Sequence, residues 1–449
     1  MNTARPTEHV SRGDLLSVYV CFFLSGAAGL VYEVLWMRTL GLVFGNTVFA
    51  VTTVLAAFMA GLALGAFLFG KVIDRLGRPL RIYALLEGAI GISCLFVPVL
   101  LVEAKTLYLT LYRLVGFSFF ALTLGQFAVV FLVLLVPTTL MGASLPVVAT
   151  FFVNRMEDLG RKVGNLYALN TFGAVTGCAA AGFFLVPTIG VRATTFLAAG
   201  VNLGVGAWTL VADRWMRRPY DASLEPPEAC RPPISQARPQ ESRPFVTWVV
   251  LAGIGLSGAA SMAYEVAWTR ALSLVIGSST YAFSAMLTTF LVGLAFGSFL
   301  FARIWGERRV DAALFGWFEL AIGISALALV PTFERMPDLV LALLKRFSPS
   351  AGGALLTQFG ISFLCMILPT MLMGAAFPCA VQVCSRDLSR LGRDIGQVYS
   401  VNTVGTIVGA LLTGFLFVPW LGAQASMTAA AGVNVAVGAA ALTLSVPER

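Results

Sequence analysis

Six ionisable side chains stand within long apolar runs of the sequence, and they have the most chemistry to offer. They are Glu33, Arg38, Glu87, Glu265, Arg270 and Glu319. An ionisable group in the middle of a bilayer is unfavourable by about 2.5 to 3.5 kcal/mol, so it persists where it is paired, hydrated or functional. The set therefore predicts either a binding and coupling site for a transported solute or buried ion pairs that fix helix packing.

The spacing of these residues argues against pairing within one helix. Glu33 and Arg38 are five residues apart, as are Glu265 and Arg270. Five residues turn a helix by about 500°, which leaves the two side chains about 140° apart. We therefore expect crossed pairs between helices, Glu33 with Arg270 and Glu265 with Arg38. Such pairs could form a gate toward the extracellular end or serve packing alone.

Glu87 and Glu319 differ from the other two acids in their depth. They stand about two turns inside the cytoplasmic end of their apolar runs. We expect them to pair with loop arginines such as Arg75 and to control conformation rather than bind solute. Any intramembrane carboxylate that takes up and releases a proton would also suit proton coupling.

Aromatic and amide side chains accompany the charges. The aromatic set consists of Tyr32, Trp36, Tyr264 and Trp268. These side chains could form a cation-binding wall, but an interfacial belt or plain packing is the favoured interpretation. The second set consists of Asn170 and Asn402, with Tyr167 and Tyr399. Hydrogen bonds between helices explain these residues better than contact with a solute does. Gln126 and Gln358 are expected to face a central cavity.

The composition places these residues in a membrane. The chain has 449 residues, of which 58% are hydrophobic and 12% charged, whereas a soluble domain is about 25% charged. This excludes a soluble enzyme, a nucleic-acid binder and a disordered regulator. The net charge of +8 is typical of positively charged cytoplasmic loops. The only histidine, His9, lies in the polar tail, and no metal or cofactor site is predicted.

The chain is a tandem duplication with an offset of 232 residues. The segment from Leu24 to Arg38, LSGAAGLVYEVLWMR, recurs from Leu256 to Arg270 as LSGAASMAYEVAWTR. Each copy divides into six apolar spans, and an even number of spans returns the chain to its starting side, so the copies are parallel repeats. We therefore predict an all-α polytopic membrane protein with 12 transmembrane helices in two parallel six-helix repeats. The fourth span of each repeat carries two prolines and should be kinked or interrupted.

The predicted organisation has five parts. They are a cytoplasmic tail (1–16), a first six-helix bundle (17–212), a cytoplasmic Pro/Arg-rich linker (213–247), a second bundle (248–445) and a cytoplasmic C-terminus (446–449). This arrangement puts 22 Lys and Arg residues on the cytoplasmic side and six on the opposite side. The asymmetry places both termini in the cytoplasm.

Two groups of motifs resemble known families. The loop from Gly70 to Arg78, GKVIDRLGR, resembles the signature between the second and third helices of the major facilitator superfamily. The resemblance implies that Asp74, Arg75, Gly77 and Arg78 hold the cytoplasmic helix ends together in the outward-facing state. The duplicated YEVxWxR, MGAxxP and GxxYxxNTxG segments are similar to the membrane portion of fused major facilitator and spermidine synthase proteins, and this resemblance implies a bacterial inner membrane.

The resemblance shapes the expected function. In the fused proteins an aminopropyltransferase-like domain follows the last helix, whereas this sequence stops at Arg449, so we expect no enzyme activity. We predict a secondary transporter of a small solute that works by alternating access. The acids and the family context favour an organic cation such as a polyamine, exchanged with protons, although Arg38 and Arg270 could receive an anionic group. The alternative is a membrane scaffold for a separate cytoplasmic aminopropyltransferase-like enzyme.

Overall fold

The computed structural model describes residues 12–44, 48–115, 119–216, 244–276, 280–335, 338, 342 and 351–445. Most of the predicted tail, the linker residues 217–243 and the predicted C-terminus lie outside the described residues. The described residues are almost entirely helical and contain no strand.

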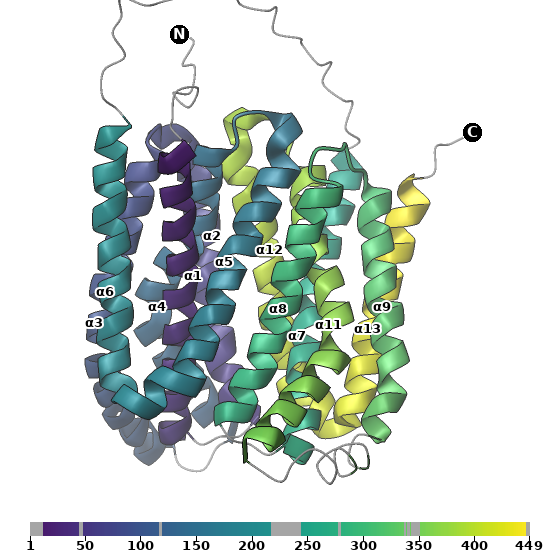
Figure 1. Cartoon of the computed structure of the whole chain (residues 1–449). Coiled ribbons are helices and arrows are strands. Elements are labelled where there is room, and N and C mark those ends of the chain that lie inside the picture. The colour runs from purple at the N-terminus through teal and green to yellow at the C-terminus, as the bar shows by residue number, and fades with distance from the viewer. Residues whose placement is uncertain are drawn as a thin grey trace, which may run out of the picture.

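Each half of the chain contributes six long helices. The first half has α1 (Arg12–Phe44), α2 (Val48–Leu76), α3 (Pro79–Val115), α4 (Phe119–Phe152), α5 (Leu159–Ala179) and α6 (Val186–Trp215). The second half has α7 (Pro244–Ile276), α8 (Thr280–Ile304), α9 (Ala312–Glu334), α11 (Ala351–Cys384), α12 (Leu391–Leu412) and α13 (Val418–Ser445). Short 3-10 turns precede α5 (Met156–Asp158) and α12 (Leu388–Arg390). The two halves lie side by side (Figure 1).

These helices are long and apolar enough to cross a membrane. Ten apolar helical segments qualify, and two of them, Met156–Trp215 and Leu388–Leu444, are 60 and 57 residues long. A crossing needs about 20 residues, so each of the two long segments contains two crossings. The described helices therefore make twelve crossings, which confirms the predicted fold class of an integral membrane protein.

The turns inside the two long segments depend on glycine. Gly190 has φ 78° and its counterpart Gly422 has φ 81°, a left-handed conformation that glycine adopts without strain. A π-helical stretch precedes each turn, at Ala180–Leu185 and Thr413–Phe417. A proline follows each stretch, at Pro187 and Pro419, and its missing N–H disturbs the α-helical ladder one turn earlier.

The fourth span was predicted to be kinked or interrupted, and the structure shows no interruption. Helix α4 runs unbroken through Pro137 and Pro146, and α11 runs unbroken through Pro369 and Pro378. Neighbouring helices pack closely on α4 and α11, and such packing supports a helix whose hydrogen-bond ladder a proline has weakened.

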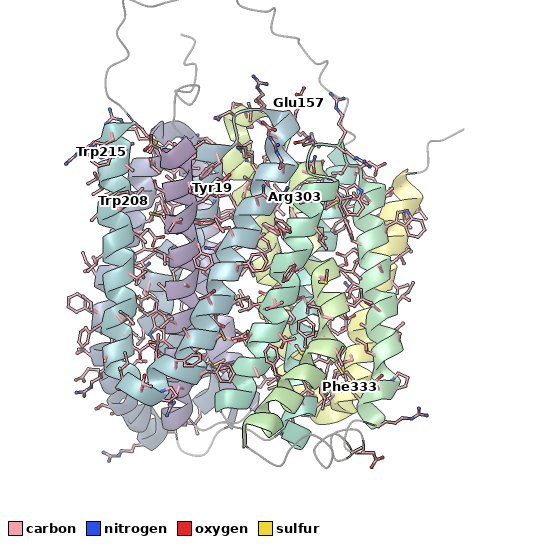
Figure 2. All side chains as sticks on the ribbon, in the orientation of Figure 1. Tyr19, Glu157, Trp208, Trp215, Arg303 and Phe333 are labelled. Carbon is pink, nitrogen blue, oxygen red and sulfur yellow. The ribbon has the colours of Figure 1, made fainter. Side chains whose placement is uncertain are left out.

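The two halves meet along two helix pairs. Helix α2 packs against α12, and α5 packs against α8; we call these pairs the α2/α12 seam and the α5/α8 seam. Helix α1 begins, and α6 and α13 end, at the same end of the bundle (Figure 1). Figure 2 shows Glu157 and Trp215 at this end and Phe333 at the opposite end. We call the first of these the clasp end.

Candidate functional site

Two carboxylates from equivalent positions of the two halves lie within range of each other. Glu33 of α1 is 7% exposed, and Glu265 of α7 is partly buried. They lie close enough for their charges to interact. Two ionised carboxylates in a weakly solvated place repel each other, so a cation or a proton near them is favourable.

The predicted crossed ion pairs are not formed. Within the described part of the chain, no ion pair joins Glu33 to Arg270 or Glu265 to Arg38. Both arginines are exposed. Within each helix, the glutamate and arginine side chains point about 140° apart. A glutamate that faces the other half therefore leaves the arginine of its own helix facing away from that half.

A row of aromatic rings crosses the boundary between the halves. Tyr167 of α5 packs on Phe377 of α11 with ring centroids 4.7 Å apart, and Phe377 meets Tyr399 of α12 at 5.9 Å. Tyr399 lies within electrostatic range of Glu33. One of the tyrosines that the sequence assigned to helix pairing therefore stands within range of a carboxylate.

The predicted aromatic wall has a different role. Tyr32 stacks on Trp36 at 5.5 Å, and Tyr264 stacks on Trp268 at 5.3 Å. All four side chains are at most 3% exposed. They pack within their own halves and form neither an interfacial belt nor a surface open to solute.

The hydroxyl groups of the two stacked tyrosines begin a duplicated polar network. Tyr32 donates to Asn202 Oδ1 at 3.0 Å, and Asn202 Nδ2 donates to Glu87 Oε2 at 2.7 Å. Ser25 donates to Glu87 Oε1 at 2.6 Å. The network joins α1, α3 and α6 inside the first bundle.

The second half repeats this network. Tyr264 donates to Asn434 Oδ1 at 2.9 Å, and Asn434 Nδ2 donates to Glu319 Oε2 at 2.7 Å. Glu87 and Glu319 are both fully buried. The prediction that they pair with loop arginines such as Arg75 is wrong, because an asparagine amide inside each bundle binds the carboxylate, and in the first bundle Ser25 adds a hydroxyl donor.

The predicted amides divide into two cases. Asn170 of α5 donates to the Phe22 carbonyl of α1 at 3.1 Å, which is the expected bond between helices. Asn402 lies against Gly258 of α7, as Asn170 lies against Gly26 of α1. The side chains of Gln126 and Gln358 lie outside the described residues, so their position toward a cavity stays a prediction.

Asp74 closes the α2/α12 seam at the clasp end. Its carboxylate accepts hydrogen bonds from the backbone N–H groups of Gly392 at 2.9 Å and Arg393 at 3.0 Å. These groups begin α12, where the first N–H groups of a helix lack internal acceptors and favour negative charge. Gly77 forms the adjoining turn with φ 60°, and Arg75 and Arg78 are exposed.

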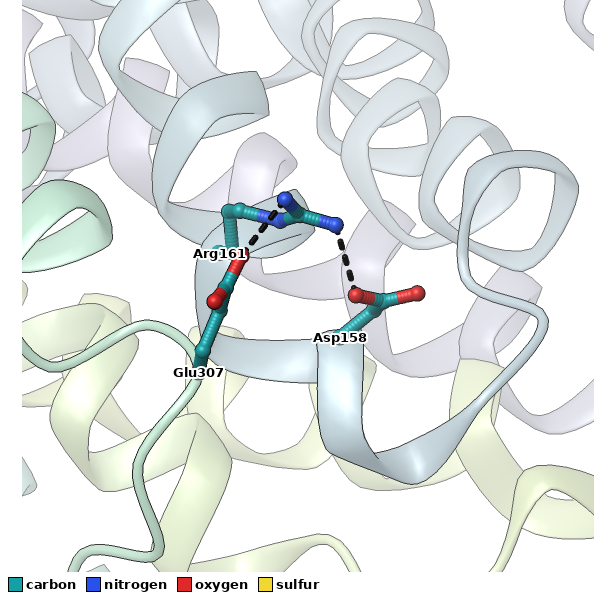
Figure 3. Close-up of polar contacts among 3 residues, drawn as sticks. All are labelled: Asp158, Arg161 and Glu307. Carbon is teal, nitrogen blue, oxygen red and sulfur yellow. Dashed lines mark hydrogen bonds and ion pairs between the residues drawn. The ribbon is translucent and has the colours of Figure 1, made fainter.

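The α5/α8 seam is closed by a different set of groups. The backbone N–H of Arg161 donates to the Gly306 carbonyl at 3.0 Å. The Arg161 guanidinium pairs with Asp158 at 2.7 Å and with Glu307 at 2.6 Å (Figure 3). Arg161 and Gly306 are the repeat equivalents of Arg393 and Asp74, so a backbone carbonyl and an ion pair replace the aspartate. No sequence pattern singled out Arg161 or Glu307.

Among the described residues, no group of three His, Cys, Asp or Glu side chains is placed to hold a metal ion. The arrangement therefore offers a carboxylate pair with neighbouring aromatic rings between the halves, and closed contacts at the clasp end.

Comparisons with known proteins bear on the fold. No family model matches the chain. Two curated relatives from Streptomyces coelicolor, polyamine aminopropyltransferase 1 and polyamine aminopropyltransferase 2, match at 26% identity over 211 residues and 29% over 203 residues. The matches cover 46% and 44% of this chain but 36% and 34% of the relatives. The chain thus spans about a third of their length. The matches agree with the resemblance to fused major facilitator and spermidine synthase proteins.

Solved transporter structures share the whole fold. The human organic anion transporter MFSD10 has 14% identity and a TM-score of 0.54, covering 95% of this chain and 99% of that chain. A bacterial homologue of the iron transporter ferroportin, in an outward-facing state, has 15% identity and a TM-score of 0.56, covering 96% and 98%. The proton:xylose symporter XylE has 14% identity and a TM-score of 0.54, covering 97% and 96%. The chain has the major facilitator fold.

Proposed function

We propose that this protein is a secondary transporter that carries a small organic cation across the membrane by alternating access between its two halves. The observation that carries the proposal is the Glu33 and Glu265 pair, which brings one carboxylate from each half to their boundary. A cation held by both acids would bridge the halves, and its release would leave them free to separate. Tyr399, which lies within electrostatic range of Glu33, offers a ring face that attracts a cation.

Proton coupling follows from the same pair. When the solute leaves, the acids need another positive partner, and protons can take that place. Exchange of the cation for protons would then couple transport to a pH gradient. A polyamine fits the chemistry, because two ammonium groups on one chain could meet two carboxylates. The titrating and binding roles of Glu33 and Glu265 are the core of the proposal, and Arg38 and Arg270 act at its edge.

The clasp end is proposed to be the cytoplasmic side. The charge asymmetry of the loops supports this orientation, and the family resemblance supports a bacterial inner membrane. Asp74 and Arg161 would then hold the cytoplasmic side closed while the opposite side exchanges solute.

Uptake in proteoliposomes tests the function. Labelled putrescine, spermidine, amino acids and organic anions are offered with and without a pH gradient to wild type, Glu33→Gln and Glu265→Gln. We expect gradient-driven uptake of an amine that falls at least about tenfold in each variant, since each removes a charged partner of the solute. Glu103→Gln, at an exposed position, is the matched control. Unimpaired uptake in both Gln variants, or uptake of anions only, would refute the proposal.

A second candidate rests on the two matches to polyamine aminopropyltransferases. The chain could serve a separate cytoplasmic enzyme of that class by delivering or removing its solute. Affinity purification of the tagged protein from gently solubilised membranes tests this idea. Recovery of an aminopropyltransferase-like enzyme, together with no uptake of any solute in proteoliposomes, would favour the scaffold over the transporter.

A further inference from the structure

The two seams between the halves are equivalent by sequence repeat but differ in polarity. On the α5/α8 seam stand Cys178 and Thr288. Their equivalents on the α2/α12 seam, 232 residues away, are Ala410 and Ala56. The two seams therefore differ in polarity at these two positions.

Cys178 connects the polar seam to the carboxylate pair. Its side chain is fully buried and lies within electrostatic range of both Glu33 and Glu265. The thiol donates to the Ser284 carbonyl of α8, with sulfur and oxygen 3.8 Å apart. A thiol has one proton, so this bond uses its only donor.

Thr288 has a hydroxyl that is left without a partner. The residue is 6% exposed, and its Oγ1 has no hydrogen-bond partner in the described structure. A threonine inside a helix usually donates to the carbonyl four residues earlier. For Thr288 that carbonyl belongs to Ser284, which accepts the Cys178 thiol instead.

The next residue shows the usual arrangement. Thr289 donates to the Ala285 carbonyl at 2.9 Å, so its hydroxyl is satisfied within α8. An unpartnered buried hydroxyl is unfavourable by about 1 to 3 kcal/mol. The Thr288 oxygen therefore keeps a hydrogen-bond acceptor that the protein alone does not use, next to the Cys178 thiol, which lies within electrostatic range of both carboxylates.

The other seam is apolar at the two equivalent positions. Ala410 is buried in an apolar cluster with Leu55, Met262 and Val266, so the α2/α12 seam can contact methylene groups at this level. Hydroxyl groups lie one turn away, because the buried Oγ1 atoms of Thr52 and Thr413 have no hydrogen-bond partner among the described residues. The contrast between the seams is therefore local to these two positions.

We propose that Thr288 and Cys178 form the polar wall of the solute site and recognise the N–H groups of a primary alkylammonium. The Thr288 oxygen would accept an N–H hydrogen bond while Glu33 and Glu265 supply the opposite charge. The alkyl part would lie toward Ala56 and Ala410. A quaternary ammonium has the charge but no N–H, so it gains nothing from Thr288. This inference rests on the proposed cation transport and names the class of cation.

Substitution of the hydroxyl tests the inference. Uptake of labelled putrescine is measured in proteoliposomes for Thr288→Val, Thr288→Ser and the matched control Thr289→Val. We expect Thr288→Val to raise the KM about tenfold, as for loss of a hydrogen bond to a charged group. Thr288→Ser and Thr289→Val should stay within about twofold of wild type. Inhibition by fully N-methylated putrescine should be the same in all four proteins.

The outcomes separate this inference from the proposed function. Equal effects of Thr288→Val and Thr289→Val, or equal loss of inhibition by the methylated amine, would overturn the role of Thr288 while transport stands. Absence of putrescine uptake and of putrescine-induced thermal stabilisation in wild type would overturn both. If Thr288→Val does not fold, Thr288→Ala, which copies the residue at Ala56, takes its place with the same expected result.

Discussion

Glu87 and Glu319 show how a carboxylate can reside deep inside a membrane protein without a cationic partner. Each accepts a hydrogen bond from an asparagine at 2.7 Å, and Ser25 supplies a further donor to Glu87. Buried polar groups are tolerated where such bonds satisfy them. The donors to Glu87 come from two other helices of its bundle, so this carboxylate ties three helices together, whereas the Asn434 bond joins Glu319 of α9 to α13.

Removal of the Glu87 carboxylate should destabilise the first bundle. Glu87→Ala leaves the Asn202 amide and the Ser25 hydroxyl without their acceptor, which we expect to lower the free energy of unfolding by about 1 to 3 kcal/mol. Glu87→Gln keeps one acceptor oxygen and should lose less. Thermal unfolding of the purified protein in detergent measures the difference. Glu103→Ala, at an exposed position, is the control, and equal midpoints for Glu87→Ala and Glu103→Ala would contradict the expectation.

Residue types were more predictable than residue partners. The repeat identified Glu33 and Glu265 as a matched pair, and the helical spacing correctly indicated that Arg38 does not pair with Glu33 in its own helix. The partner across the boundary depends on how α1 and α7 are rotated toward each other, which no local pattern encodes. The unpartnered hydroxyl of Thr288 was equally hidden, because it depends on a thiol from another helix.

Close helix packing within each half depends on paired glycines. Gly173 and Gly177 of α5 lie against the backbone of Phe23 and Ala27 in α1, where an added Cβ would overlap carbonyl oxygens. Gly405 and Gly409 of α12 lie against α7 in the same way. Both pairs have the GxxxG spacing, which lets two helix backbones approach closely. The π-helical stretches before the turns have no such spacing pattern in the sequence. They accommodate a proline that follows each stretch, and a proline alone does not specify a π-helix.

A side chain at Gly177 should push α5 away from α1. Gly177→Ala places a methyl group against the Ala27 carbonyl, and such overpacking is unfavourable by about 1 to 3 kcal/mol. We expect a lower midpoint of thermal unfolding in detergent. Gly29→Ala is the control, since a Cβ there meets open space, and it should be neutral or slightly stabilising. A Gly177→Ala midpoint at or above that of Gly29→Ala would be incompatible with this packing role.

At the scale of the whole molecule, duplication explains the architecture but not its asymmetries. Hydropathy and the constant offset predict twelve helices in two parallel bundles, because lipid forces each span to satisfy its own backbone. The contacts between the bundles are free to diverge after duplication. Asp74 and Gly306 occupy equivalent positions, yet one acts through a carboxylate and the other through a backbone carbonyl.

The divergence predicts that the two seams open independently at the clasp end. Arg161 stands in the first turn of α5, where backbone N–H groups lack acceptors within the helix, so its N–H relies on the Gly306 carbonyl across the seam. Arg161→Glu would place a negative charge against Asp158 and Glu307. We expect hydrogen exchange of backbone amides in residues 159–163 to accelerate by about threefold to tenfold, in keeping with partly exposed ion pairs.

Charge restoration is the decisive comparison for this seam. The double variant Arg161→Glu with Glu307→Arg rebuilds the ion pair across the seam and should return the exchange toward wild type, measured by mass spectrometry on the intact protein in detergent. Asp74→Ala serves as the counterpart on the other seam and should accelerate exchange at Gly392 and Arg393 while leaving residues 159–163 unchanged. Acceleration at both seams in either variant would mean that the clasp end opens as one unit, because the contacts of one seam would then depend on those of the other.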